Sequence, residues 1–421
     1  MVDVKPLEAI VYNQEKVDIN KVIAPPYDVI SEYYAKELFE RSEYNIINLI
    51  LAKGSTNPKD ENNRYKNANK CYQKWLNENI LVKTDKPCIF YLLQKYSTND
   101  GKDITRKGFI ARCKIEDFST KKILPHEYTM GGPKEDRLNL TKECKANFSQ
   151  VFFVYSDKEK QIENAIDYSQ KPFIDVVDDA GVQNIVYKID DEKIINLIEN
   201  LLKDKTLLIA DGHHRYETAM NYSKLNPDKN YVMSYFTNSE DDLLIFPTHR
   251  IITKKISKEK LLESVKKYFD IKEFEYNREN KKDVKKEFLK AIEEENKNTI
   301  AMGLCIRNDN KFYLLTLREN VDNIVDAPEV LKSLDLVVLH KVILEKELGY
   351  SQEEMMSQNG VLYEKQEDKA FDMSGETQAS FIMAYPKIED IKRISSAGER
   401  MPQKSTYFYP KLLSGIVINP L

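Results

Sequence analysis

Five consecutive residues near the middle of the chain could together bind an anion: Asp211, Gly212, His213, His214 and Arg215. This segment, the Asp211–Arg215 box, follows the apolar run 207–210 and precedes residues 216–225, a pattern that predicts a buried strand and then a helix. A glycine between strand and helix leaves backbone amides free, and a helix start attracts negative charge. The guanidinium and imidazoles add donors for phosphate oxygens, while the carboxylate could hold a hydroxyl group or Mg²⁺. We interpret the box as a phosphate-handling site, against the alternative of a corner in which the histidines only pack or cap.

A carboxylate suited to proton transfer follows two prolines early in the chain. Pro25 and Pro26 fix an extended backbone path, so Tyr27 and Asp28 are expected on a rigid loop. A carboxylate held in this way can take a proton from a substrate hydroxyl. The alternative is that Asp28 caps the helix expected to begin near Ser31.

Three more segments combine charged, aromatic and hydroxyl side chains. Their candidate site residues are His126, Glu127 and Arg137; His249 and Arg250; and Lys404, Ser405, Thr406 and Tyr407. Residues 125–137 contain Gly-Gly-Pro and are expected to form a loop that either lines a site or is only solvated. The histidine–arginine pair is balanced between an anion contact and a salt-bridged structural role. The last group resembles the end of a P-loop but lacks Gly-x-x-x-x-Gly, and a packed carboxy-terminal tail is its alternative.

Composition and charge exclude several classes of protein. A net charge of -4, with 64 basic and 68 acidic residues, argues against a protein that coats nucleic acid. No apolar run approaches the roughly 20 residues of a membrane span, and the amino terminus lacks the features of a signal peptide. The five cysteines show no CxxC spacing, so we expect a cytoplasmic protein without disulfides or a zinc site.

The chain alternates between strand-like and helix-like segments, which predicts the α+β (mixed α/β) class. Strands are expected at 8–12, 17–23, 88–96, 104–114, 150–155, 207–210, 299–306, 311–317 and 379–385, and as a pair at 231–236 and 243–246. Helices are expected at 60–80, 192–203, 216–225, 258–269, 282–295, 328–348 and 387–397, and a turn at 99–101. Three parts follow: a core over 1–254 that includes an inserted region 60–200, an α+β lobe over 255–350, and a segment 351–421 that returns to the active site.

Four stretches give the chain a resemblance to DUF1015, a family of unknown function. They are 24–30 (Ala-Pro-Pro-Tyr-Asp-Val-Ile), 136–138 (Asp-Arg-Leu), 210–219 around the box, and 401–411 (Met-Pro-Gln-Lys-Ser-Thr-Tyr-Phe-Tyr-Pro-Lys). The box also resembles the phosphate-binding box of the ParB/sulfiredoxin superfamily, in whose free-serine kinases an Asp-Gly-x-His-Arg segment cradles nucleotide phosphates. The resemblance implies a ParB/sulfiredoxin-like core with large insertions and an additional lobe.

The resemblance also implies an activity and a set of roles. The expected enzyme is a small-molecule kinase that uses ATP, ADP or pyrophosphate with Mg²⁺ and phosphorylates a hydroxyl group, with free L-serine as the leading acceptor. Asp28 matches the early acidic residue that activates serine, and Glu127 and Asp211 are its rivals. Phosphate contacts are assigned to Gly212, His213, His214, Arg215, His249, Arg250, Lys404, Ser405 and Thr406, and substrate contacts to Tyr27, His126, Arg137 and Tyr407.

Other classes of function stay open at this point. A nucleotide-binding switch or partner-binding module could use the same box without metabolic turnover. A hydrolase or redox enzyme that acts on a phosphorylated substrate is a third reading, although the box lacks the cysteine of sulfiredoxin chemistry. About 180 residues separate Asp28 from Asp211, so a large insertion or a permuted layout is required.

Overall fold

The computed structural model describes residues 1–98, 101–129, 131–318 and 320–421 and divides into two compact units. Unit 1 contains Met1–Pro125, Thr129–Leu244 and Pro410–Leu421, and unit 2 contains His126–Tyr128 and Ile245–Tyr409. The expected turn at 99–101 falls partly on residues 99 and 100, which lie outside the described residues. No helix in the described ranges is long and apolar enough to cross a membrane.

Unit 1 is built on a mixed sheet to which nine strands of the described residues contribute. In spatial order these are β6 (Ile123–Leu124), β11 (Leu207–Asp211), β8 (Val151–Tyr155), β12 (Tyr231–Asn238), β5 (Asp103–Lys114), β4 (Ile89–Ser97), β10 (Gln183–Ile189) and β9 (Ile174–Val177), with β1 (Val4–Lys5) paired to β5. The β4–β5 hairpin is antiparallel and β12 runs parallel to β8, which makes the sheet mixed. The strands expected at 88–96 and 104–114 are confirmed as β4 and β5, and the strand expected at 150–155 is confirmed as the buried β8.

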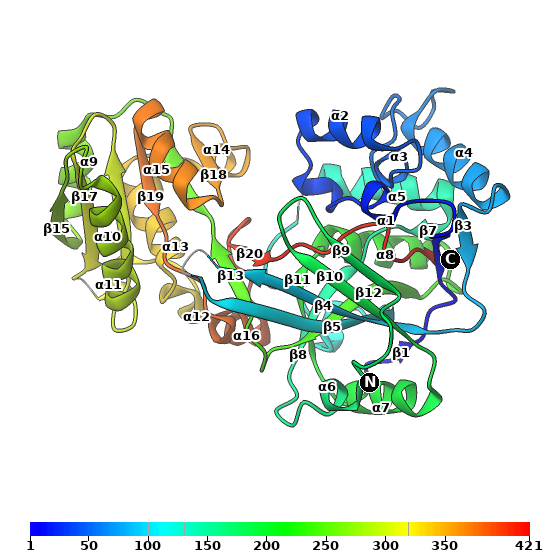
Figure 1. Cartoon of the computed structure of the whole chain (residues 1–421). Coiled ribbons are helices and arrows are strands. Elements are labelled where there is room, and N and C mark those ends of the chain that lie inside the picture. The colour runs from blue at the N-terminus through cyan, green and yellow to red at the C-terminus, as the bar shows by residue number, and fades with distance from the viewer. Residues whose placement is uncertain (99–100, 130, 319) are drawn as a thin grey trace. The chain divides into compact units, whose positions relative to one another are not determined.

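Helices flank this sheet, as Figure 1 shows. They are α1 (Ile19–Val22), α2 (Glu32–Arg41), α3 (Ile47–Ile50), α4 (Arg64–Asn77), α5 (Gly131–Cys144), α6 (Gln161–Ala165), α7 (Glu192–Leu202) and α8 (His213–Leu225). The helix predicted at 60–80 is α4, and Tyr65, Tyr72 and Trp75 are buried on one of its faces. The core around the sheet is rich in aromatic rings, and Phe109 and Phe236 stack with centroids 4.9 Å apart.

The carboxy-terminal segment 410–421 is threaded through unit 1 and is buried over most of its length. Ser414 pairs with Ala24, Ile418 pairs with Ile10, and β21 (Asn419–Pro420) pairs with β7 (Ala146–Asn147). A smaller ladder joins β2 (Ile10–Tyr12) to β3 (Leu81–Lys83). In Figure 1 this red segment passes beside α8 and β7. The last residues of the chain are therefore part of the first unit's core.

Unit 2 has its own sheet and its own core. The sheet order is β15 (Phe269–Glu275), β17 (Lys311–Leu317), β16 (Ala301–Ile306), β19 (Ala379–Ile382), β14 (His249–Ile252) and β18 (Val361–Glu364), and β13 (Leu244–Pro247) pairs with β20 (Thr406–Tyr409). The helices are α9 (Lys258–Lys266), α10 (Lys281–Glu295), α11 (Val321–Ile324), α12 (Glu329–Lys332), α13 (Asp335–Val338), α14 (Gln352–Met356), α15 (Glu367–Glu376) and α16 (Ile388–Ser396). Phe288, Phe312 and Phe371 pack together in its core.

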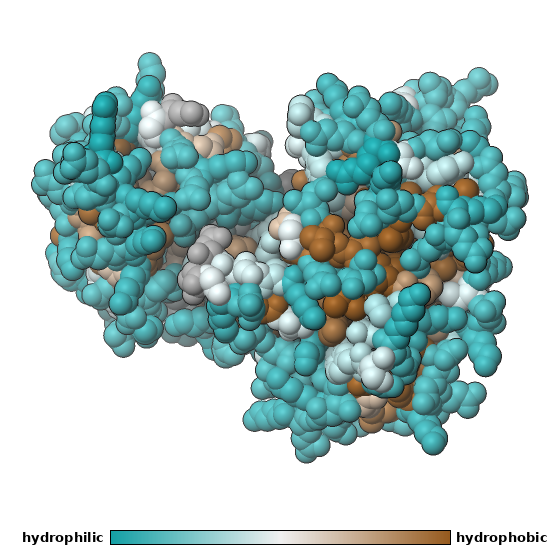
Figure 2. Space-filling model, viewed as in Figure 1, coloured by the Kyte–Doolittle hydropathy of each residue, from teal (hydrophilic) through white to brown (hydrophobic). Residues whose placement is uncertain are grey.

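Hydrophilic residues cover most of the face shown in Figure 2, in line with a charged content of 31%. Hydrophobic residues gather on one visible part of unit 1, over its sheet. The dense Lys and Glu of the helices α9 and α10 lie mainly on solvated faces.

Two predicted elements in unit 1 are wrong. Residues 17–23 were expected as a strand, but Ile19–Val22 form α1, because the Asp18 carboxylate accepts a hydrogen bond from the Asn20 amide and caps a short helix. Residues 125–137 were expected as a loop, but α5 begins at Gly131. A proline in the first turn of a helix is tolerated because its missing amide hydrogen would have no partner there.

Two further differences lie toward the carboxy terminus. The strands at 231–236 and 243–246 do not pair with each other, since β12 lies between β5 and β8 while β13 pairs with β20. The helix expected over 328–348 is broken at Leu334, whose extended backbone separates α12 from α13, and a π-helical segment follows over Leu339–Glu347. The unit boundaries also differ from the expected domains, because 245–254 and 351–409 both belong to unit 2.

We predict that Gly108→Ala strongly destabilises unit 1. A Cβ atom there would meet the Phe236 carbonyl oxygen and the Tyr235 ring inside van der Waals contact, so the free energy of unfolding should fall by roughly 3 kcal/mol. Gly181→Ala is the control, because its Cβ would meet open space and only its φ of +78° is strained, which costs about 1 kcal/mol. Urea unfolding followed by the fluorescence of Trp75, the single tryptophan, reports both values. Equal effects would contradict the packing account.

Candidate phosphate-binding site

The Asp211–Arg215 box lies where β11 ends and α8 begins, as the sequence predicted. Gly212 has a φ of 85° and a ψ of 29° and occupies the position before the first helical residue, with no side chain capping the helix. The left-handed backbone favours glycine here, and the Arg215 guanidinium lies close over it, since a Cβ at this position would be 2.9 Å from the Arg215 Cζ atom. The first amides of α8 have no partner inside the helix, which leaves a donor-rich end.

Two cations converge on the Asp211 carboxylate. Lys411 Nζ and Arg215 Nη2 each lie 3.3 Å from Asp211 Oδ2, and the Gly212 amide lies 2.9 Å from Oδ1. Burial would raise the pKa of Asp211, but the charges of Lys411, Arg215 and His213 outweigh it and hold that pKa far below the usual carboxyl range. Asp211 is therefore a permanent anion at the end of the strand.

The two histidines of the box differ in exposure. His213 is buried, while His214 is half-buried on the first turn of α8. Burial lowers the pKa of His214, although the carboxylates of Glu217 and Asp28 act in the opposite direction. Because its ordinary pKa is already near 6.5, His214 is neutral at pH 7 and offers one donor and one acceptor.

The Pro-Pro-Tyr-Asp loop belongs to the same unit as the box. Tyr27 and Asp28 lie in a short 3₁₀ turn (Tyr27–Val29) before α2, and Asp28 is exposed. The helix α2 is capped by Ser31, whose hydroxyl accepts a hydrogen bond from the Tyr34 amide at 3.2 Å. The capping role considered for Asp28 is thus filled by another residue, and its carboxylate stays available.

Arg137 holds this loop in place. Its Cζ atom lies 4.1 Å from the centroid of the Tyr27 ring, and its Nη1 donates to the Ile50 carbonyl oxygen at 2.8 Å. Arg137 Nε also donates to Asp136 Oδ2 at 2.8 Å, and the Tyr65 hydroxyl donates to Asp136 Oδ1 at 2.9 Å. The Asp-Arg-Leu stretch therefore acts as a brace between α4, α5 and the loop.

A second brace joins the start of α5 to α8. Thr129 Oγ1 donates to the Glu217 carboxylate at 2.9 Å, and Lys134 Nζ lies 2.8 Å from Glu217 Oε2. Glu217 follows the box by two residues, so these contacts fix the first turns of α8. Residues on both sides of Gly-Gly-Pro thus support the helix that carries the box.

Lys411 is the residue that sequence reasoning missed. It closes the 401–411 stretch, which carried the family resemblance, but no role was assigned to it. Its backbone is anchored by buried side chains, since Arg106 Nη2 donates to the Pro410 carbonyl oxygen at 2.6 Å and Gln94 Nε2 donates to the Lys411 carbonyl oxygen at 3.2 Å. A lysine directly before an apolar tail was the available signal, although 200 residues separate it from Asp211.

The other predicted site residues belong to unit 2, where several of them contact one another. The group comprises His126, Glu127, His249, Arg250, Lys404, Ser405, Thr406 and Tyr407. His126 Nε2 and Thr406 Oγ1 are 2.8 Å apart, and Glu127 forms a bridge with Met401. Lys365 Nζ lies 4.2 Å from the centroid of the Tyr407 ring. Among the predicted residues, the structure brings Tyr27, Asp28 and Arg137 together in one unit with the box.

His249 and Arg250 lie in the interior of unit 2. His249 Nδ1 accepts a hydrogen bond from the Met383 amide at 3.1 Å, and Arg250 Nε donates to His340 Nε2 at 3.0 Å. Burial lowers the pKa of Arg250 to about 10, and burial together with Arg250 lowers the pKa of His249 to about 3. The Arg250 guanidinium also stacks on Tyr363 at 4.3 Å. These contacts favour the structural role that the sequence had left open.

A cavity of about 50 Å³ lies beside the box and is lined by Tyr27, Arg137, Arg215 and Ser149 among others. This volume holds a few water molecules but not a nucleotide. Within the described residues, no group of three or more His, Cys, Asp or Glu side chains could hold a metal ion. Asp211 already neutralises two cations, so the residues present do not fit a Mg²⁺ ion held by the protein alone.

The chain belongs to the family described as "Protein of unknown function (DUF1015)", whose model matches residues 4–337. No curated protein matches it. Among solved structures, a free serine kinase in complex with AMP is 15% identical, with 68% of this chain and 83% of that chain covered and a TM-score of 0.35. SbnI with C-terminal truncation from Staphylococcus aureus is 10% identical over 72% of this chain and 85% of that chain, with a TM-score of 0.37. Similarity at this level does not assign a function.

We predict that the Asp211–Lys411 pair shows strong coupling in a double-mutant cycle. Lys411→Met leaves a largely buried carboxylate with one cation fewer, which should lower the free energy of unfolding at pH 7 by roughly 2 to 3 kcal/mol. Asp211→Asn combined with Lys411→Met should recover at least about 1 kcal/mol of that loss. Urea unfolding monitored through Trp75 measures all three variants.

The pH dependence of the same cycle follows from the depressed pKa of Asp211. The stabilisation from the charged pair is complete above the unfolded carboxyl pKa of about 3.9 and is lost as the pH falls through the lower folded pKa. The deficit of Lys411→Met should therefore shrink as the pH is lowered below about 4. Additive effects at pH 7, or a deficit that does not change with pH, would contradict the ion pair.

Proposed function

We propose that this protein is a small-molecule kinase that transfers a phosphoryl group from ATP, ADP or pyrophosphate to a hydroxyl group, with free L-serine as the leading acceptor. The observation that carries the proposal is the uncapped start of α8 at Gly212, with Lys411 and Arg215 both held against Asp211 beside it. Phosphoryl transfer depends mainly on positioning and on neutralisation of phosphate charge. The family resemblance of the box supports the same chemistry.

A bound phosphate would compete with Asp211 for the two cations. Arg215 is only 10% exposed at its side chain and covers Gly212, and Lys411 is 13% exposed. When a donor phosphate arrives at the amides of α8, it offers oxygens at the same short range as the carboxylate. We infer that Arg215 then turns from Asp211 toward the phosphate, which uncovers the glycine. Asp211 keeps both cations near the site when no donor is bound.

Asp28 is the carboxylate best suited to act as the base. Asp211 is a weak base because its cationic neighbours hold its pKa far below the usual range. Glu127 belongs to unit 2, whereas Asp28 shares unit 1 with the box and is close enough to raise the pKa of His214. Asp28 is also exposed on a loop that two prolines and the Tyr27–Arg137 contact hold still. It can accept the proton of an acceptor hydroxyl as the phosphoryl group is transferred.

The donor's phosphates would carry any Mg²⁺ that the reaction needs, because magnesium in kinase-type sites is bound largely through substrate phosphates and water. The protein's part is to bind the phosphates, orient the acceptor and hold the base. All five cysteines are unpaired, which supports a reducing compartment such as the cytoplasm.

The direct test is a screen of L-serine with ATP, ADP and pyrophosphate in the presence of Mg²⁺, with O-phosphoserine detected by ³¹P NMR. We expect product with at least one donor, and Asp28→Asn should lower kcat by about 10²- to 10³-fold with little change in donor affinity. Asp204→Asn, at an exposed carboxylate outside the site, is the matched control and should keep full activity. Donor binding without any product would instead favour a nucleotide-binding switch.

Arg215→Ala should weaken binding of the phosphate donor and leave proton transfer to Asp28 unchanged. Loss of a charge-assisted contact to phosphate should raise the KM for the donor by about tenfold or more, and Arg215→Lys should recover only part of it because it lacks the planar guanidinium. Steady-state kinetics with the donor concentration varied at saturating L-serine separates the KM for the donor from kcat. A wild-type donor KM in Arg215→Ala would remove Arg215 from the phosphate site.

A further inference from the structure

Unit 2 contains a pocket of about 500 Å³ that the proposed phosphate chemistry does not use. All the residues that line it belong to unit 2, and none of them belongs to the Asp211–Arg215 box. Its walls come from the start of α13, the loop 296–300 before β16, the segment 383–387 after β19, and the first turn of α16. The volume falls in the range of pockets that bind small molecules.

Asp335 supplies a carboxylate that lacks a counter-ion. Its two oxygens accept hydrogen bonds from the Leu336 amide at 2.6 Å and the Ala384 amide at 3.3 Å, and the described residues provide no ion pair for it. A carboxylate can accept about four hydrogen bonds, so acceptor capacity remains. Burial raises the pKa of Asp335 to about 6, against the effect of the two amides and of Arg250. A bound ammonium group would supply the missing positive charge.

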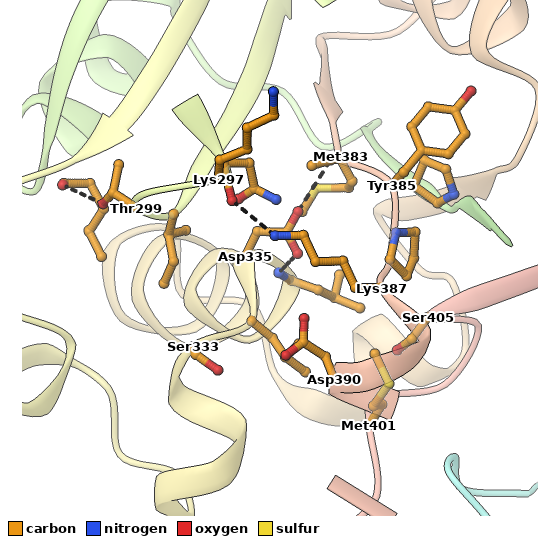
Figure 3. A pocket seen from close by; sticks show the side chains of 18 of the residues that line it. Lys297, Thr299, Ser333, Asp335, Met383, Tyr385, Lys387, Asp390, Met401 and Ser405 are labelled. Carbon is orange, nitrogen blue, oxygen red and sulfur yellow. Dashed lines mark hydrogen bonds between the residues drawn. The ribbon is translucent and has the colours of Figure 1, made fainter. Parts of the chain in front are cut away.

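Lys387 supplies a cation on the same side of the pocket. It directly precedes α16 and lies three residues beyond Ala384, whose amide bonds Asp335. Within the described residues its ammonium makes one hydrogen bond, a long one of 3.5 Å to the Asn296 carbonyl oxygen, and its charge acts against the burial that raises the pKa of the Glu293 carboxyl group. Figure 3 shows the side chains of Asp335 and Lys387 both reaching into the pocket. One group of each sign is therefore available within a short stretch of wall.

The other charged residues of the pocket are already neutralised by close neighbours. Lys297 Nζ lies 2.8 Å from Glu294 Oε2, and Arg393 Nη2 lies 3.0 Å from Asp390 Oδ1. These ion pairs are formed within a helix or at its end and lie toward solvent. A charged ligand would have to break them to use Lys297 or Asp390, so Asp335 and Lys387 are the better partners.

Apolar side chains form part of the remaining wall, beside polar side chains that include Thr248, Asn298, Thr299, Asn320, Ser333 and Ser405. The apolar members that are buried and face the pocket are Ile300, Leu317, Leu334, Leu336, Met383 and Ile391. The apolar part of the wall suits an aliphatic group, because contact with it removes hydrocarbon surface from water. A pocket with one anion, one cation and an aliphatic wall matches an amphoteric molecule with an apolar side chain.

We propose that the unit 2 pocket binds a free α-amino acid with an aliphatic side chain, its ammonium group on Asp335, its carboxylate on Lys387 and its side chain against the leucine and isoleucine wall. This site is independent of the proposed kinase reaction, and its ligand is distinct from the hydroxylated acceptor. The full chain is the protein to test.

Isothermal titration calorimetry with L-leucine tests the site directly. We expect saturable binding of one molecule per chain, and at least about tenfold weaker binding of isoamylamine, which lacks the carboxylate, and of 4-methylpentanoate, which lacks the ammonium group. L-Serine should also bind at least about tenfold more weakly, because it leaves the aliphatic wall uncovered. Equal binding of L-leucine and the two analogues, or no binding of L-leucine, would overturn the proposal.

Four variants locate the binding site. Asp335→Asn and Lys387→Met should each weaken the binding of L-leucine by about tenfold or more. Lys387→Met should also abolish the preference for L-leucine over isoamylamine. Lys297→Met and Asp390→Asn are the matched controls and should bind as the wild type does, because their charges are already paired. Lys387 is exposed, so its replacement keeps the fold even if Asp335→Asn does not. Wild-type affinity in Lys387→Met would place any bound amino acid elsewhere.

Discussion

The structure of unit 1 depends on the neutralisation of one carboxylate at the end of a buried strand. Asp211 would be expensive to ionise there without partners, and it remains charged because Arg215 from the next turn and Lys411 from the end of the chain both approach it. Lys411 reaches this position because residues 410–421 are built into the unit by β-pairs and buried apolar side chains. A charge balance between distant segments therefore sets the electrostatics of the box.

The remaining parts of the candidate site are held by contacts of the same kind. Arg137 stacks on Tyr27 and binds Asp136, so the loop that presents Asp28 is tied to α5 and not left to solvent. Arg106 fixes the backbone just before Lys411. Arginine suits these positions because its planar group stacks and donates several hydrogen bonds at once. The proposed base and the side chains proposed to bind phosphate are thus positioned by rigid elements of one unit.

The sequence predicted the local features well and the distant ones poorly. The strand–glycine–helix order of the box, the helix α4 and the strands β4, β5, β16 and β17 follow from short-range patterns. The contact of Lys411 with Asp211 joins residues 200 positions apart, and no local periodicity reports it. The role of Arg250 was ambiguous for a related reason. A charged residue after a strand can contact either a ligand or a buried side chain, and the sequence does not show that His340 packs against Arg250. The capping by Asp18 and Ser31 was equally a matter of local geometry that propensity alone does not resolve.

The central claim is that the box and its two cations bind a transferable phosphate, and calorimetric titration of the full chain with pyrophosphate tests it most directly. The account predicts saturable binding that weakens by about tenfold or more in both Arg215→Ala and Lys411→Met, with adenosine unable to bind in its place. Binding of pyrophosphate that is the same in the wild type and in both variants would contradict it, as would its complete absence in the wild type.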